Sequence, residues 1–282
     1  MSEMIAVIGA GQMGNGIAHV CAQAGLSVTM IDVSEGALAK GKSTIEKNLE
    51  RQIKKGTLDA AARDAILGRL STNTDLGAVA NASVAIEAAT ENVTLKFKIF
   101  ADLDRLAPAG TILATNTSSI SITEIAAQTK RPEQVIGMHF MNPVPVMQLV
   151  EIIRGLATSD ATTARVVELS KAVGKTPVEV NDYPGFVANR ILMPMINEAV
   201  FCVMEGVGTP EAVDTVMKLG MNHPMGPLAL ADLIGLDTCV AILDVLHTGL
   251  GDPKYRACPL LRKYVAAGWL GRKSGRGFYT YA

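Results

Sequence analysis

The segment Gly9-Ala-Gly-Gln-Met-Gly14 has the spacing G-x-G-x-x-G and sets the architecture of the chain. It follows the apolar run 5–8 and opens an Ala-rich amphipathic stretch over 12–24. A second β-branched run, 27–31, leads directly into Asp32, eighteen residues after Gly14. Three glycines alone would be weak evidence, because this spacing also occurs in ordinary loops. Strand, glycine turn, helix and strand in this order favour a βαβ unit that binds a dinucleotide at its first turn.

Each part of this unit has its own physical task. Gly9 makes the tight turn, Gly11 lets the backbone approach a pyrophosphate, and Gly14 lets helix and strand pack closely. Asp32 is expected to accept hydrogen bonds from the adenosine ribose hydroxyls and to repel a 2′-phosphate. The two residues after Asp32 supply no arginine to neutralise such a phosphate, so the sequence favours NAD over NADP. The alternative is a glycine-rich turn with an Asp that caps a helix.

Composition excludes several other classes of protein. The 282 residues are 49% hydrophobic and 19% charged, with 26 basic and 27 acidic side chains and a net charge of -1. These values fit neither a disordered chain nor a basic nucleic-acid binder, and no apolar run is long enough to cross a bilayer. No signal peptide is visible, and the four cysteines are far apart and form no C-x-x-C. We expect a cytoplasmic protein with reduced thiols and no metal site.

Short β-branched runs alternate with helical stretches up to about residue 155, and long apolar helices take over after Asp182-Tyr-Pro-Gly185. The pattern predicts an α/β fold, a Rossmann-type mostly parallel sheet domain over 1–183 followed by an all-α domain over 184–282. Strands are expected at 5–8, 27–31, 84–87, 111–115, 135–139, 149–153 and 177–180. Helices are expected at 12–24, 35–55, 59–69, 93–106, 160–172, 186–205, 210–219, 227–248 and 258–267.

Two residues form the candidate catalytic pair. His139 ends a predicted strand, at the carboxyl edge of the sheet where open α/β sheets bind ligands. Glu151 lies between Leu149-Val150 and Ile152-Ile153, and a carboxylate in such apolar surroundings needs a partner. An imidazole oriented by this carboxylate would be a general base. Singly, the histidine could be structural and the glutamate could face solvent. His19 and His247 fall in helical patterns and are expected to be structural or surface residues.

Two further polar segments lie near the predicted edge of the sheet. Thr115-Asn-Thr-Ser-Ser119 follows a strand and is rich in hydroxyl and amide groups, although it could equally cap the helix after it. Asn189 is expected in the first turn of the helix that begins the second domain, beside the domain junction, where clefts form.

Taken together, these motifs make the chain similar to the short-chain L-3-hydroxyacyl-CoA dehydrogenases over nearly its full length, and most of all to the bacterial 3-hydroxybutyryl-CoA dehydrogenases. The resemblance rests on Val7–Gly14, Glu87-Ala-Ala-Thr-Glu-Asn92, Asn116–Ser119, Gly137–Pro145, Leu149–Ile152, Asp182–Arg190 and Gly271-Arg-Lys-Ser-Gly-Arg-Gly-Phe-Tyr279. By position within these motifs, it implies that His139 and Glu151 are catalytic and that Ser118 and Asn189 orient the substrate. It also implies that Glu91, Lys96, Asn116 and Asn142 belong to the cofactor site, that an acyl-CoA is the substrate, and that the helical domain forms a homodimer.

The expected reaction is NAD-dependent oxidation of (S)-3-hydroxyacyl-CoA to 3-oxoacyl-CoA, or its reverse. A dehydrogenase for free 3-hydroxy acids or for branched or dicarboxylic acyl-CoA is one alternative, and a catalytically silent NAD-binding protein is another. Helix 35–55 places Lys40, Lys47, Arg51 and Lys54 on one stripe, of which Arg51 and Lys54 are candidates to bind the CoA phosphates. A solvated face is the plain alternative. Helix 186–205 is broadly apolar, which suggests a dimer interface unless it is simply central to its own domain.

Overall fold

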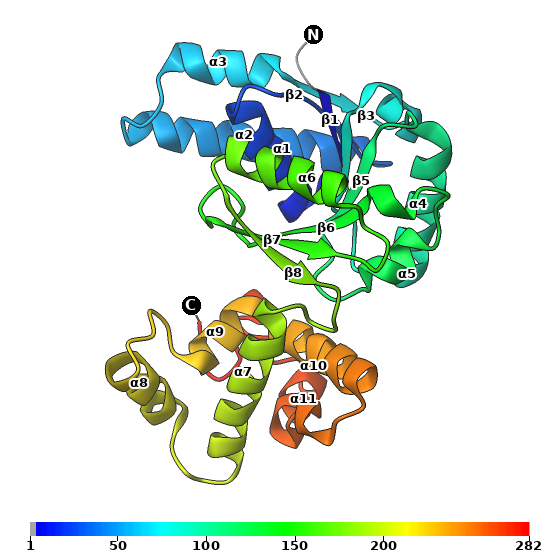
Figure 1. The fold of residues 1–282 in the computed structure, drawn as a ribbon. Coiled ribbons are helices and arrows are strands. Elements are labelled where there is room, and N and C mark those ends of the chain that lie inside the picture. Colours follow the sequence, from blue (N-terminus) through cyan, green and yellow to red (C-terminus); the bar gives the residue numbers. More distant parts are fainter. Residues whose placement is uncertain (1–3, 282) are drawn as a thin grey trace. The chain divides into compact units, whose positions relative to one another are not determined.

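The computed structural model describes residues 4–281 and divides the chain into two compact units between Asp182 and Tyr183. The first unit holds one eight-stranded sheet, ordered β3-β2-β1-β4-β5-β6-β7-β8 (Figure 1). Every neighbouring pair is parallel except β6 with β7. The strands are Met4–Ile8 (β1), Ser27–Ile31 (β2), Leu70–Asn73 (β3), Val84–Glu87 (β4), Ile112–Thr115 (β5), Val135–Phe140 (β6), Leu149–Arg154 (β7) and Thr176–Asn181 (β8).

Helices cover both faces of this sheet, with α1, α2 and α6 on one face and α4 and α5 on the other (Figure 1). Helix α2 shows why: Leu38, Ile45 and Leu49 recur at helical spacing and are buried, while its basic residues face solvent. The α-helices of this unit are Gln12–Gln23 (α1), Glu35–Lys54 (α2), Ala60–Gly68 (α3), Val93–Leu106 (α4), Ile122–Ala126 (α5) and Asp160–Ala172 (α6). The expected Rossmann-type, mostly parallel sheet is confirmed.

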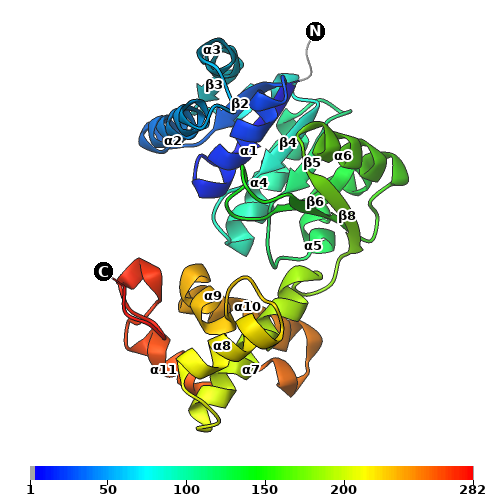
Figure 2. The ribbon, with the colours of Figure 1, turned by 90° about the vertical axis from the view of Figure 1, so that its left-hand side faces the viewer.

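The second unit is helical, and α7 contacts each of the four other helices (Figure 2). Its core includes Met193, Ile196 and Val200 of α7 with Leu243 and Leu246 of α10. The helices are Ala188–Met204 (α7), Pro210–Gly220 (α8), Pro227–Ile234 (α9), Leu236–Leu250 (α10) and Pro259–Ala266 (α11). Within residues 4–281, no helix has both the length and the hydropathy that crossing a membrane requires.

Three details differ from the expected elements. The helix expected over 227–248 is two helices, because Gly235 takes a φ of 105°, a conformation that ends α9 and that glycine adopts without strain. Strand β3 was not expected, because only Leu70 of its four residues is buried and no alternation marks it. Helix α7, which was expected to be broadly apolar, buries a polar residue and exposes an apolar one. Asn197 is buried and bonds the backbone of Arg256 and Cys258, whereas Ile191 is 66% exposed.

Candidate active site

The glycine loop has the geometry that a dinucleotide requires. Gly9 has a φ of 105°, and a Cβ there would lie 2.7 Å from the carbonyl oxygen of Ala88. A Cβ on Gly14 would collide with the Gly9 carbonyl, so only glycine allows helix α1 to pack this closely on β1. A Cβ on Gly11 would meet nothing within 4 Å, which leaves open space where the backbone can approach a phosphate.

The N-terminus of α1 is built differently from those of the other α-helices in the first unit. Side chains of Ser34, Asp59, Asn92, Ser121 and Ser159 cap α2 to α6, whereas the cap residue of α1 is Gly11, which has no side chain to accept from the first turn. The first turn of α1 also contains no acidic residue. Its N–H groups and the positive end of the helix dipole can therefore act on an anionic group.

Asp32 follows β2 at the same edge of the sheet. Its Oδ2 accepts from the Ala10 backbone N–H at 2.8 Å, and its Oδ1 accepts from the Ser34 N–H at 3.0 Å. These two bonds fix the carboxylate beside the glycine loop, and each oxygen keeps a further lone pair that can accept a ribose hydroxyl. The residues present fit NAD.

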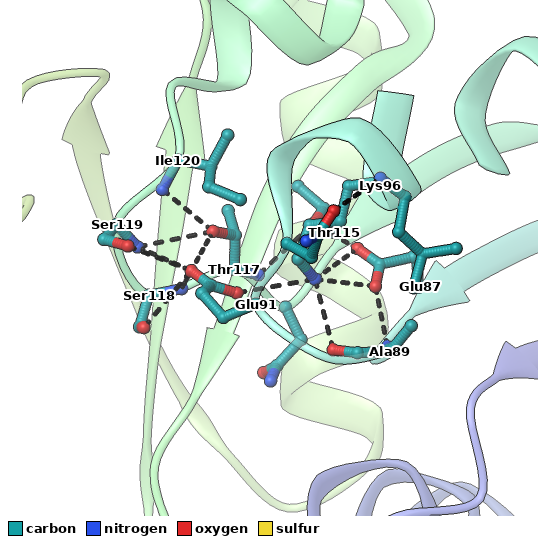
Figure 3. Close-up of polar contacts among 12 residues, drawn as sticks. Glu87, Ala89, Glu91, Lys96, Thr115, Thr117, Ser118, Ser119 and Ile120 are labelled. Atoms are coloured by element: carbon teal, nitrogen blue, oxygen red, sulfur yellow. Dashed lines mark hydrogen bonds and ion pairs between the residues drawn. The ribbon is translucent and has the colours of Figure 1, made fainter. Parts of the chain in front are cut away.

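A buried ion pair joins the last residue of β4, Glu87, to Lys96 of α4 (Figure 3). Lys96 and Glu87 are 1% and 0% exposed, and the lysine Nζ lies 2.6 and 2.8 Å from the two oxygens of Glu87. The same carboxylate accepts from the Ala89 N–H and from Thr115 Oγ1, each at 2.7 Å. Lys96 also lies 3.5 Å from Oε2 of Glu91, so one lysine joins two carboxylates.

Glu91 in turn holds the segment that contains Ser118. Its Oε1 accepts from Thr117 Oγ1 at 2.5 Å and from the backbone N–H groups of Ser118 and Ser119 at 2.9 and 3.1 Å. Burial alone would raise the pKa of Glu91, but the charge of Lys96 and these hydrogen bonds outweigh it and lower the pKa. The contact with Ser118 Oγ is the longest to this oxygen, at 3.3 Å. Glu91 therefore fixes the backbone of the loop more firmly than the Ser118 hydroxyl.

The segment 115–119 does not cap the following helix, as one interpretation of the sequence allowed. Ser121 caps α5, because its hydroxyl accepts from the Glu124 N–H. Asn116 instead links two strands: its N–H donates to the Glu87 carbonyl at 2.7 Å, and its Oδ1 accepts from the Phe140 N–H at 2.9 Å. The Ser118 loop is thus tied to the end of β6, next to His139.

His139 and Glu151 contact each other. They occupy paired positions of the antiparallel strands β6 and β7, and Nδ1 of the histidine lies 2.8 Å from Oε2 of the glutamate. Both residues are buried. This contact orients the imidazole and leaves Nε2 as the nitrogen on the other side of the ring.

The loop between β6 and β7 carries Asn142, whose Oδ1 accepts from Gln12 Nε2 at 3.0 Å. Lys175, directly before β8, holds this loop by donating from Nζ to the carbonyls of Val144 at 2.5 Å and Met147 at 2.8 Å. Burial lowers the pKa of Lys175. Sequence reasoning missed this lysine, as an isolated Lys before a strand gives no signal.

The remaining candidates lie on α7 and α2. Asn189 is buried in the first turn of α7, in the second unit. Arg51 and Lys54 are exposed on α2 and line a surface groove that also contains Glu46 and Glu50. Glu87 was not singled out by the sequence, although it begins one of the quoted motifs.

The glycine loop, the N-terminus of α1 without a side-chain cap, and Asp32 together define a nucleotide-dependent oxidoreductase of the Rossmann type. The family model described as "3-hydroxyacyl-CoA dehydrogenase, NAD binding domain" matches residues 4–183, and that described as "3-hydroxyacyl-CoA dehydrogenase, C-terminal domain" matches 185–281. The chain belongs to the 3-hydroxyacyl-CoA dehydrogenase family, whose members are NAD-dependent oxidoreductases.

Individual relatives match nearly the whole chain. A probable 3-hydroxybutyryl-CoA dehydrogenase of Bacillus subtilis is 60% identical over 99% of this chain and 97% of its own length. A 3-hydroxybutyryl-CoA dehydrogenase of Bradyrhizobium diazoefficiens is 54% identical over 99% of this chain and 95% of its own. The crystal structure of (S)-3-hydroxybutyryl-CoA dehydrogenase from Ralstonia eutropha superposes with a TM-score of 0.97 at 54% identity, covering all of both chains. The expected family and the NAD cofactor are confirmed.

Proposed function

We propose that the protein oxidises (S)-3-hydroxybutyryl-CoA to acetoacetyl-CoA with NAD, or runs the reverse reduction, and that His139 and Glu151 are its acid/base pair. The observation that carries this proposal is the 2.8 Å contact between His139 Nδ1 and Glu151 Oε2 at the ligand-binding edge of the sheet. The names of the matching relatives support the choice of substrate.

In the oxidation, Nε2 of His139 removes the proton from the C3 hydroxyl, and the C3–O bond becomes a carbonyl. Bound NAD supplies the acceptor for the hydride that leaves C3. The imidazole gains a positive charge in this step, and the Glu151 carboxylate on its other nitrogen stabilises that charge. In the reduction, the protonated His139 returns the proton to the carbonyl oxygen.

Two polar side chains are proposed to orient the substrate. Ser118 lies on the loop that Glu91 and Asn116 hold, so the backbone that carries its hydroxyl is fixed before substrate binds. Asn189 is assigned by its place in Asp182–Arg190, which matches the motif of the family. Hydrogen bonds from both to the C3 oxygen and its surroundings would fix C3 for hydride transfer.

The second unit is proposed to form a homodimer. Eight apolar side chains of this unit are between 40% (Met204) and 81% (Leu219) exposed, and a second copy of the unit would cover apolar surface of this kind. The exposed members are Val187, Ile191, Met204, Val207, Val216, Leu219, Met221 and Leu233.

An absorbance assay with NADH and acetoacetyl-CoA tests the proposed reaction. We expect the NADH band to decay with acetoacetyl-CoA and to persist with free acetoacetate at the same concentration. Turnover of the free acid at equal efficiency would favour a dehydrogenase of free 3-hydroxy acids. Binding of NADH without turnover of any 3-oxoacyl compound would favour the catalytically silent alternative.

A further inference from the structure

Glu87 is a buried carboxylate to which the proposed mechanism gives no task. All four of its contacts are internal: Lys96 on both oxygens, the Ala89 N–H on Oε1 and Thr115 Oγ1 on Oε2 (Figure 3). Each carboxylate oxygen thus has two donors. A carboxylate satisfied in this way is held in one position and cannot readily turn toward a ligand.

Lys96 depends on this carboxylate as its counterion. A buried ammonium group without a partner is strongly disfavoured, and the bidentate contact at 2.6 and 2.8 Å has the length of charge-assisted hydrogen bonds. Glu91 is the more distant partner at 3.5 Å, and its side chain is 37% exposed. Glu87 therefore fixes the lysine, and the fixed lysine acts on Glu91.

The order of the strands places this cluster toward the nicotinamide half of the cofactor. The pyrophosphate belongs at the Gly11 turn after β1, and the adenosine ribose belongs at Asp32 after β2. The other nucleoside must then extend across the opposite neighbour of β1, which is β4. Glu87 ends β4, and Glu91 follows it in the connection to α4.

We propose that the charge of Glu87 sets the redox preference of the site: Glu87 and Glu91 outweigh Lys96, so the cluster of Glu87, Lys96 and Glu91 carries one net negative charge beside the nicotinamide, which favours oxidised over reduced cofactor. The charge follows from two ionised carboxylates around one ammonium. The nicotinamide ring is cationic in NAD⁺ and neutral in NADH, so this charge acts on the oxidised form alone. The inference rests on the proposed function for its relevance to turnover, but it concerns binding of the cofactor.

The experiment compares the dissociation constants of NAD⁺ and NADH for the full chain, by calorimetry and by NADH fluorescence, without substrate. Glu87→Gln keeps the shape of the side chain and removes its charge. A unit charge about 10 Å away in an effective dielectric of about 20 changes binding on the order of tenfold, so Kd(NAD⁺)/Kd(NADH) should rise by about that factor. An unchanged ratio in a folded Glu87→Gln protein would overturn the proposal.

Two matched variants separate charge from packing. Thr115→Val removes one hydrogen bond from the Glu87 carboxylate and leaves its charge unchanged. Glu87→Asp shortens the side chain and also keeps the negative charge. Both should keep the ratio within about twofold of wild type, because the net charge is retained. A tenfold shift in Thr115→Val would show that packing sets the ratio, and would contradict the proposal.

If Glu87→Gln does not fold, Glu87→Gln with Lys96→Met removes the unpaired ammonium together with its counterion. The cluster then keeps one net negative charge, on Glu91. This double variant should therefore fold and keep the wild-type value of Kd(NAD⁺)/Kd(NADH). Failure to fold, or a tenfold shift, would overturn the role of Glu87 as counterion. A wild-type protein that binds NAD⁺ but turns over no hydroxyacyl-CoA would remove the proposed function and leave this test intact.

Discussion

His139 and Glu151 are paired across the antiparallel strands β6 and β7, with 2.8 Å between Nδ1 and Oε2. The reversal of β7 makes this contact at the ligand edge possible. Strand β6 runs with β1 to β5 and ends at Phe140, so His139 lies near its carboxyl end. Because β7 runs the other way, its third residue, Glu151, lies at that same edge.

Asp32 should determine the choice between NAD and NADP. Asp32→Ala removes the acceptor for the ribose hydroxyls and the charge that repels a 2′-phosphate, so we expect weaker NAD binding and a smaller preference for NAD. Steady-state kinetics with both cofactors measures this directly. Equal catalytic efficiency with NADP in the unmutated protein would contradict the assignment.

The basic residues of α2 should attract the phosphates of CoA. Reversal of two charges, in Arg51→Glu with Lys54→Glu, should raise KM for acetoacetyl-CoA several-fold and leave KM for NADH nearly unchanged, and salt should raise the wild-type KM for acetoacetyl-CoA. Lys98→Glu with Arg105→Glu on α4 is the control for the same change in net charge. If both double variants behave alike, α2 does not bind the CoA group.

His19 should make the stability of the fold depend on pH. Its side chain is fully buried, its Nδ1 has no hydrogen-bond partner among the described residues, and burial lowers its pKa from 6.5 to about 4. Because the unfolded chain binds the proton more readily between these values, stability from this group is complete above pH 6.5 and is lost as the pH falls toward 4.

Urea unfolding at several pH values measures this contribution. The free energy of unfolding should fall by up to about 3 kcal/mol across that interval through His19 alone. His19→Leu should flatten the pH dependence, whereas the exposed His247→Gln should retain it. An equally steep pH dependence in His19→Leu would assign the effect to other groups.

The exposed apolar surface of the second unit should be covered in solution by a second copy. Sedimentation at micromolar concentration should give about twice the mass of one chain, and Leu219→Glu with Ile191→Glu should shift the protein toward the monomer. A species of single-chain mass only, in the unmutated protein, would mean that these side chains remain in water.

The sequence predicted what local spacing determines and missed what tertiary contacts determine. The glycine loop, the alternating strands and helices and the family were all visible in the sequence, because each depends on neighbouring residues or on a fixed motif. Glu87 could not be recognised, since its partner Lys96 lies nine residues away and its burial is set by the sheet. Lys175 was missed for a similar reason: its acceptors, the carbonyls of Val144 and Met147, belong to a distant loop.

Two further features, at Gly235 and at His19, could not be predicted from the sequence. Apolar periodicity runs through Gly235 without interruption, so the break between α9 and α10 was invisible until the backbone showed its positive φ. His19 was expected to be an ordinary structural or surface residue, but its buried Nδ1 lacks a partner within the described residues. Periodicity reports which residues are apolar, and it does not report which polar atoms are satisfied.

The most direct test of the central claim is the turnover of His139→Ala with acetoacetyl-CoA and NADH, measured beside NADH affinity by fluorescence. A positioned acid/base group contributes about 10²- to 10⁴-fold, so kcat should fall by that factor while the Kd for NADH changes little. If the His139→Ala protein keeps more than about half of the wild-type kcat, His139 is not the general acid or base of the reaction.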